Sequence, residues 1–230
     1  EMAEERIAER IDANLLDVTM EDLHDMPQQL YEGKMKNLRE KTQGQLIVKE
    51  YPTASAHSGH FKSLMNELAL KKSFRPDVIF IDYLNICASS RFKGGNISSY
   101  FYVKAIAEEL RGLAVEFDVP IFSATQTTRT GFVSSDIGLE DTSESFGLPA
   151  TADFMFALIS NEELEALGQM KVKQLKNRYN DPSINRAFIV GVDRAKMRLY
   201  DVQQKANDIV DANQVAEKED AYDKFSDFKL

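Results

Sequence analysis

The chain has one cysteine, Cys87, and no run of apolar residues long enough to span a membrane. A single cysteine excludes an internal disulfide framework and fits a reducing cytoplasm. No signal peptide of basic, apolar and small residues opens the chain. Because the first residue is Glu1 rather than methionine, we expect the sequence to be a processed or cropped piece of a longer protein.

Charge of both signs is present but unevenly distributed. The 230 residues carry a net charge of −9, and 43% of them are hydrophobic, which is enough for one sizeable core. Residues 169–200 carry +6, whereas residues 201–230 carry −4 and residues 1–168 carry −11. An acidic chain is a poor general coat for nucleic acid. A basic segment within it indicates a focused anion site instead.

Strands alternate with helices along the chain. Apolar periodicity, caps and turn residues predict helices at 2–16, 27–43, 55–72 (capped by Ser55 or Ser58), 98–117 and 161–167. Thr19, with Asp22 three residues later, is expected to cap a further short helix. Apolar runs predict strands at 45–49, 78–81, 119–124, 152–159, 169–176, 186–192 and 197–201. The run Val78–Ile81 lacks alternation, which is typical of a strand buried on both faces. The last two strands should form a hairpin that closes near residues 193–196.

This order predicts an α/β fold in which helices flank a mostly parallel sheet. Ligands of such folds bind at the carboxyl ends of the strands. Three strand ends carry polar residues there, namely Asp82, Gln126 and the pair Lys176 and Arg178. Residues 91–97 are predicted to form a polar, glycine-bearing loop, and the polar stretch 127–150 is long enough to be a functional or mobile loop.

Each of these residues has an ordinary alternative when taken alone. Asp82 suits a Mg²⁺ site that works through water, yet an acidic residue often ends a core strand. Gln126 can contact a γ-phosphate or be a solvated loop residue. Lys176 and Arg178 share a strand face and could stabilise phosphate charge, or simply protect a sheet edge. His57 and His60 have no further ligands nearby, so a polar pair at a helix start is favoured over a metal site.

In combination the motifs are specific. EMAEERIAER, IFIDYLNI, SATQTTR, DTSESFGLPATAD and KQLKNRYND occur in this order. They resemble the motifs of DnaB-like hexameric replicative DNA helicases, with the T-even phage type as the nearest form. The resemblance covers residues 1–202 and implies a partial RecA-like motor domain with a C-terminal β-hairpin. Residues 203–230 then form an acidic tail.

The resemblance implies a nucleotide site for ATP or another NTP with Mg²⁺. Glu1 matches the glutamate that polarises the attacking water, and Arg10 matches a basic residue of the following helix. Asp82 matches the aspartate that holds Mg²⁺ through water, and Gln126 the glutamine that senses the γ-phosphate. Lys176 and Arg178 match the lysine and arginine finger that reach the neighbouring subunit's nucleotide.

The resemblance also implies DNA-binding loops along a central channel. The loop 141–153 matches one that grips single-stranded DNA, and a second loop matches around residue 93. The family has an arginine where this chain has Ser143, and a glycine in place of Phe146. The residues that the resemblance assigns to DNA contact are Lys93, Gly94, Arg129, Glu144, Phe146 and Gly147.

One family motif is missing, because no GxxxxGK[ST] string occurs in the sequence. We therefore expect the phosphate cradle, and the strand that leads into it, to lie upstream of Glu1. In the family that strand is central in the sheet. The fragment alone should neither hydrolyse NTP nor fold robustly.

As a whole, the resemblance implies a homo-hexamer that moves 5′→3′ on single-stranded DNA in the cytoplasm of a host cell. Primase, helicase loader and polymerase are the expected partners, and the tail with Tyr222, Phe225 and Phe228 is either a docking peptide or a solvated end. Two alternatives remain open. One is a RecA-type recombinase or clock-type ATPase, and the other is a binding module without catalytic activity.

Overall fold

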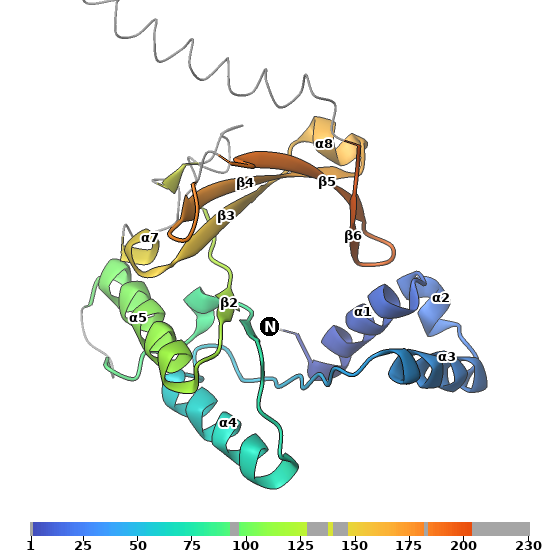
Figure 1. Cartoon of the computed structure of the whole chain (residues 1–230), viewed down its shortest axis with the longest axis horizontal. Helices are drawn as coiled ribbons and strands as arrows, with labels where there is room; N and C mark the ends of the chain where they lie inside the picture. Colours follow the sequence, from blue (N-terminus) through green and yellow to red (C-terminus); the bar gives the residue numbers. More distant parts are fainter. Residues whose placement is uncertain (1, 93–96, 128–137, 140–146, 182–183, 204–230) are drawn as a thin grey trace, which may run out of the picture.

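The computed structural model describes residues 2–92, 97–127, 138–139, 147–181 and 184–203. Figure 1 shows a sheet that arches over the molecule, with long helices below it on one side and a separate group of helices on the other. The tail 203–230, apart from its first residue, lies outside the described residues.

Apart from the short η1 and α7, the helices occur close to where the sequence predicts them. They are α1 (Glu4–Leu16), α2 (Met20–His24), α3 (Gln28–Lys41), α4 (Ser58–Lys72), a 3₁₀ turn η1 (Leu84–Ile86), α5 (Ser99–Phe117), α7 (Gly147–Thr151) and α8 (Glu162–Ala166). The strands are β1 (Ile79–Ile81), β2 (Ile121–Ser123), β3 (Phe154–Ile159), β4 (Gln169–Asn177), β5 (Ala187–Asp193) and β6 (Arg198–Asp201).

The strands form two sheets. β1 and β2 pair in parallel, with Ile79 opposite Ile121 and Ile81 opposite Ser123. The second sheet has the order β3–β4–β5–β6, and all its pairs are antiparallel. β5 and β6 form the predicted hairpin. The predicted α/β fold is thus present, with a parallel sheet and a C-terminal antiparallel sheet, although the larger of the two described sheets is the antiparallel one.

The largest core cluster surrounds α5. Val103, Ile106, Ala107 and Leu110 recur at helical spacing, so they lie on one face of the helix. Ile106 is almost fully buried at 1% exposure, and Leu84, Cys87 and Leu148 pack in the same cluster. Burial raises the pKa of the Cys87 thiol to about 11, so the thiol is neutral near pH 7. α5 therefore joins the segment after β1 to α7.

The beginning of the chain packs against the hairpin near the end of the described residues. The Asn14 side chain donates to the Met197 carbonyl at 2.6 Å, and the Met20 N–H donates to the Ala195 carbonyl at 2.9 Å. The Asp17 carboxylate pairs with Lys196 and Arg198 at 3.2 and 2.9 Å. These contacts attach α1 and α2 to the antiparallel sheet.

Two local predictions were wrong. Residues 45–49 form no strand, because no described strand lies beside them, and Leu46 there is exposed. The cap of α4 is His57 rather than Ser55 or Ser58: its Nδ1 accepts the Gly59 N–H at 3.0 Å, and the His60 Nδ1 accepts the His57 N–H at 3.2 Å. This reciprocal pairing confirms the polar pair at a helix start.

The predicted burial of β1 and β2 on both faces was also wrong. Phe80 is 72% exposed and Phe122 is 48% exposed. Their rings stack on each other with centroids 5.3 Å apart. The two strands are formed as predicted, but no described element covers this face of the sheet. β3 likewise exposes Phe154, Phe156 and Leu158 on one face.

Candidate functional site

The carboxyl ends of β1 and β2 lie side by side, since the two strands are parallel and in register. We call residues 82–85 and 124–126 the sheet edge. The Gln126 side chain donates to the Tyr83 hydroxyl at 3.1 Å, and the Thr125 hydroxyl donates to the Asn85 side chain at 2.8 Å. The Leu84 N–H donates to the Ala124 carbonyl at 3.2 Å. The structure therefore brings Gln126 next to the residue that follows Asp82.

Asp82 is exposed at this edge, and its carboxylate makes no hydrogen bond or ion pair within the described residues. A free carboxylate fits a Mg²⁺ ion, which keeps most of its waters and takes one or two protein carboxylates. The described part of the chain has no cluster of three His, Cys, Asp or Glu side chains that could hold a metal. Any metal at Asp82 would therefore need water or substrate oxygens as further ligands.

The two candidate cations lie together at the end of β4 and reach α7. The Lys176 ammonium donates to the Pro149 carbonyl. The Arg178 guanidinium donates to the Ala150 carbonyl at 2.9 Å and pairs with the Asp153 carboxylate at 2.9 Å. Both cations therefore lie on one side of the strand, as their spacing predicts. Carbonyl oxygens at the C-terminal end of α7, and the carboxylate of Asp153 just after it, accept the hydrogen bonds of these cations.

Asp153 lies between two arginines. Its second oxygen pairs with Arg111 of α5 at 2.8 Å, and Arg111 also donates to the Thr151 carbonyl at 2.7 Å. Hydrogen bonding to Arg111, and then to Arg178, holds the pKa of Asp153 below its ordinary value. Burial and the nearby Arg178 charge lower the pKa of Lys176. Asp153, Arg111 and Arg178 are therefore joined by ion pairs, and Lys176 is held beside them by a carbonyl oxygen.

The sheet edge and the cations form separate groups. No hydrogen bond or ion pair between described residues joins Asp82 or Gln126 to Lys176 or Arg178. Within the described residues, the Asp82 carboxylate is thus unpaired, whereas the two cations share partners at the end of α7.

A buried carboxylate that sequence reasoning missed lies on α5. Glu109 is 9% exposed and accepts hydrogen bonds from the hydroxyls of Ser89, Ser90 and Ser58 at 2.6, 2.7 and 2.8 Å. Burial opposes its charge, but these bonds and the Ser90 N–H outweigh that effect and lower the Glu109 pKa to about 2. A charged residue three positions after Ile106, on the apolar face of a helix, was the available signal.

Of the other predicted site residues, the structure describes only Arg10 and Gly147. Arg10 is exposed on α1, and no hydrogen bond or ion pair between described residues joins it to the sheet edge. Gly147 is buried at the first position of α7, a helix that the sequence did not predict. The residues that lie outside the described parts are Glu1, Lys93, Gly94, Arg129, Glu144 and Phe146.

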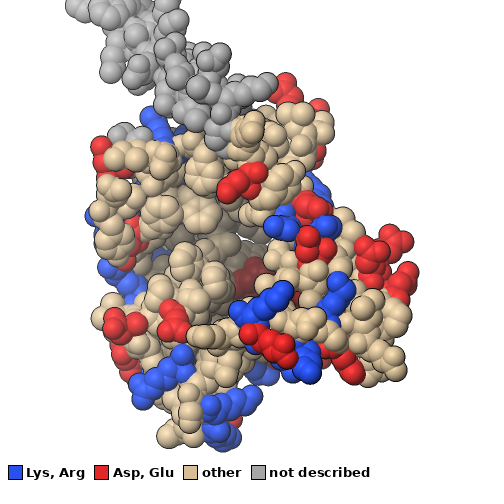
Figure 2. Space-filling model, turned by 45° about the vertical axis from the view of Figure 1, so that its right-hand side comes forward, with Lys and Arg blue, Asp and Glu red and all other residues tan. Residues whose placement is uncertain are grey.

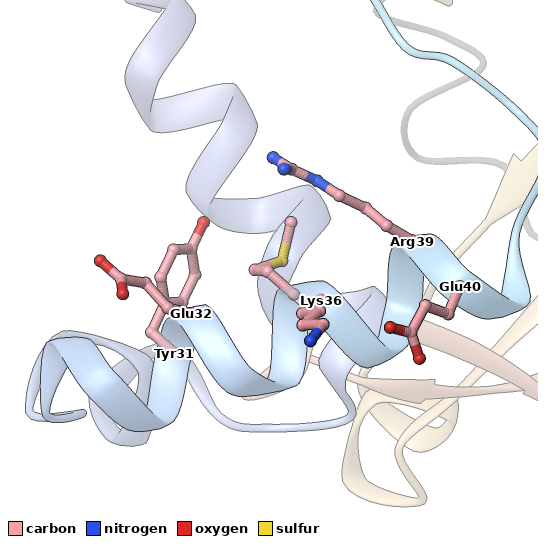
Figure 3. A pocket seen from close by; sticks show the side chains of 6 residues that line it. Tyr31, Glu32, Lys36, Arg39 and Glu40 are labelled. Atoms are coloured by element: carbon pink, nitrogen blue, oxygen red, sulfur yellow. The ribbon is translucent and has the colours of Figure 1, made fainter.

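A surface pocket lies elsewhere, along α3 (Figure 3). Its lining residues are Tyr31, Glu32, Met35, Lys36, Arg39 and Glu40. The Tyr31 hydroxyl donates to Asp12 of α1 at 2.8 Å, which ties the two helices together. None of the predicted site residues lines this pocket, so it does not replace the sheet edge as the candidate site.

Comparison with known families decides the assignment. Residues 1–194 match the family described as "DnaB-like helicase C terminal domain". The chain belongs to this family. It is 45% identical to the "DnaB-like replicative helicase" of Enterobacteria phage T4, over 96% of this chain and 48% of that protein. The chain therefore spans about half the length of this DnaB-like relative.

Two solved structures have the same fold. One, described as an ATPase domain, superposes with a TM-score of 0.71 at 16% identity, over 88% of this chain and 72% of that one. The other, described as "The Structure Of A DnaB-Like Replicative Helicase And Its Interactions With Primase", gives a TM-score of 0.68 at 16% identity, over 88% and 49%. In the described parts, every helix is too short or too polar to cross a membrane.

Proposed function

We propose that this chain is part of a motor that couples NTP hydrolysis at subunit interfaces to movement on single-stranded DNA and to duplex unwinding at a replication fork. The observation that carries this proposal is that Asp82, which has no partner among the described residues, is joined by no hydrogen bond or ion pair there to the cations Lys176 and Arg178. Such a chain can serve two nucleotides. It supplies a metal ligand to one and cations to the next, around a ring of identical subunits.

The chemistry at the proposed interface is phosphoryl transfer to water. Asp82 would hold Mg²⁺ through water, and the bound ion would supply positive charge beside the phosphates. Gln126, held at the edge by Tyr83, contacts the γ-phosphate. Glu1 polarises the attacking water, and Arg10 supports the nucleotide.

The neighbouring subunit completes the proposed site. Its Lys176 and Arg178 stabilise the negative charge that spreads over the transferred phosphoryl group. An arginine supplied in trans is worth about a thousandfold or more in rate. The guanidinium suits this task because its fork of donors matches phosphate oxygens.

The cradle for the phosphates is proposed to come from sequence outside this chain. The sequence has no GxxxxGK[ST] string, and the DnaB-like relative is about twice as long as this chain, which supports this division. In addition, β2 pairs only with β1, and β3 only with β4, among the described strands. Their free edges and the exposed Phe122 and Phe154 are suited to a further strand.

DNA contact is proposed for the two predicted loops, through Lys93 and Gly94 of one and Glu144, Phe146 and Gly147 of the other, with Arg129 nearby. Contact with phosphates rather than bases would make binding independent of sequence and sensitive to salt. A homo-hexamer that moves 5′→3′, with primase, loader and polymerase as partners, completes the proposal.

The test uses the full-length gene product and an Asp82→Asn variant. We expect hydrolysis of ATP or another NTP to be stimulated by single-stranded DNA, and a forked duplex to be unwound. Asp82→Asn should lower both rates about a hundredfold, since it removes the charge of the metal ligand. Asp77→Asn, an exposed aspartate at the opposite end of β1, is the matched control. Strand exchange without unwinding, or no hydrolysis by the wild type, would contradict the proposal.

A further inference from the structure

The segment from Pro149 to Asp153 holds both candidate cations. Lys176 donates to the Pro149 carbonyl. Arg178 donates to the Ala150 carbonyl at 2.9 Å, and its backbone N–H donates to the Asp153 carbonyl at 3.0 Å. Carbonyl oxygens at the end of α7 therefore accept hydrogen bonds from the two side chains that the proposed function assigns to a phosphate.

Asp153 is the charged member of this segment. One of its oxygens pairs with Arg178 at 2.9 Å and the other with Arg111 of α5 at 2.8 Å. Its side chain is 31% exposed, so these bonds are partly shielded from water. Hydrogen bonds between ionised partners are among the stronger contacts in proteins. Asp153 consequently ties Arg178 to both α5 and α7.

This arrangement competes with phosphate binding. Both terminal nitrogens of the Arg178 guanidinium are engaged, one by Asp153 and the other by Ala150. A phosphate that binds this pair of nitrogens in bidentate fashion competes with both acceptors, and the Asp153 carboxylate also offsets the positive charge that attracts a phosphate. Arg178 can therefore give its full fork to a phosphate only after it leaves Asp153.

The position of Asp153 in the chain connects this competition to DNA. α7 begins at Gly147, one of the residues that the resemblance assigns to contact with single-stranded DNA, and Asp153 follows α7 by two positions. A displacement of α7 would move Ala150 and Asp153 relative to Arg178. Two ligands that bias the same element affect each other's binding.

We propose that Asp153 is a positioning residue that holds Arg178 away from the neighbouring nucleotide until DNA binding displaces α7. This inference rests on the proposed function and deepens it, because it names a residue through which DNA controls hydrolysis. Asp153 itself touches neither substrate. Its effect passes through Arg178.

The test compares three variants of the full-length protein. Asp153→Asn removes the charge and keeps the size, whereas Asp153→Glu keeps the charge. The matched control is Asp17→Asn, since Asp17 also pairs with two cations, Lys196 and Arg198, but far from α7 in the fold. Hydrolysis is measured with and without single-stranded DNA. Thermal unfolding of each variant shows that it is folded.

Asp153→Asn should raise hydrolysis without DNA about threefold, the size expected for one partly exposed ion pair, and lower the stimulation by DNA in proportion. Asp153→Glu should retain most of the stimulation, and Asp17→Asn all of it. A second readout is the affinity for single-stranded DNA with and without a non-hydrolysable nucleotide analogue. By linkage, Asp153→Asn should bring the two affinities closer together.

The possible failures can be distinguished. If the wild type shows no DNA-stimulated hydrolysis, the proposed function is wrong and this inference falls with it. If the wild type is stimulated but Asp153→Asn behaves like Asp17→Asn in both readouts, only the role of Asp153 is wrong. A loss of basal hydrolysis in Asp153→Asn with unchanged stimulation would equally overturn it.

Discussion

The charged side chains of α5 are all paired, whereas Asp82 at the sheet edge has no partner among the described residues. On α5, Lys104, Glu108, Glu109, Arg111 and Glu116 each make an ion pair or hydrogen bond. Figure 2 shows acidic and basic side chains interspersed on the outside of the molecule, around a hollow whose visible wall is mostly uncharged. Paired charges hold elements together. A free carboxylate contributes little to stability and stays open to a ligand.

This contrast separates stability from activity. Neutralising the buried Glu109 of α5 should destabilise the fold, and neutralising Asp82 should change activity alone. Arg178 belongs to the paired group in this structure, yet the proposed function gives it a partner in another subunit. Substitution of Arg178 is therefore the strongest test of whether paired charges affect stability and unpaired charges affect activity.

The largest effect is expected for Arg178→Ala. Hydrolysis stimulated by DNA should fall about a thousandfold, because the transferred phosphoryl group loses a cation. Stability should change by no more than about 1 kcal/mol, since the ion pair with Asp153 is partly exposed. Steady-state hydrolysis and chemical denaturation measure the two quantities.

The control for this experiment is Arg198→Ala. Arg198 is also ion-paired to an aspartate and is similarly exposed, 48% against 45% for Arg178. Hydrolysis by the Arg198 variant should match the wild type. Equal losses in the two variants would mean that Arg178 acts through the fold rather than on a phosphate.

Glu109→Gln should destabilise the protein by about 2 kcal/mol near neutral pH, because a buried carboxylate with several donors loses its charge. The folded pKa of Glu109, about 2, lies below its ordinary value of 4.5. Its stabilising contribution is therefore complete above about pH 4.5 and is lost as the pH falls toward 2.

Denaturation from about pH 3 to about pH 7 checks this prediction. The difference between wild type and Glu109→Gln should shrink as the pH falls below 4.5. Asp82→Asn should leave the unfolding free energy within about 0.5 kcal/mol of the wild type. A pH-independent difference for Glu109, or a large one for Asp82, would remove the distinction between the two regions.

The smallest effect is expected for Tyr83→Phe. The Tyr83 hydroxyl accepts a hydrogen bond from Gln126 at 3.1 Å, so its loss frees the glutamine side chain. Hydrolysis should fall about fivefold, as expected for one hydrogen bond of about 1 kcal/mol. Tyr31→Phe, which removes the bond from α3 to Asp12 of α1, should leave hydrolysis unchanged.

Much of this organisation could be predicted from local sequence. Strands that end at Asp82 and near Gln126 are visible as apolar runs followed by polar residues. Thr19 caps α2 as its spacing suggests, since its hydroxyl oxygen accepts the Asp22 N–H at 3.0 Å. The alternate positions of Lys176 and Arg178 also correctly place both on one side. These features depend on neighbours within a few residues.

The remainder depends on partners distant in sequence. Asp153 meets Arg111 from 42 residues away, and Glu109 meets Ser58 from 51 residues away, so no local pattern shows either contact. The burial of Phe80 was wrongly predicted for the same reason. An apolar run reveals the preference for burial, but only the full arrangement of elements reveals whether a layer covers it.

Mixing two inactive variants of the full-length protein tests the central claim, that one chain serves two nucleotides, most directly. Asp82→Asn and Arg178→Ala subunits are combined, allowed to assemble, and assayed for DNA-stimulated hydrolysis. In mixed rings, some interfaces pair an intact Asp82 with an intact Arg178 from the neighbour, so hydrolysis should recover well above that of either variant alone. If subunits exchange and hydrolysis stays at the level of the separate variants, Asp82 and Arg178 do not act on the same nucleotide from different subunits.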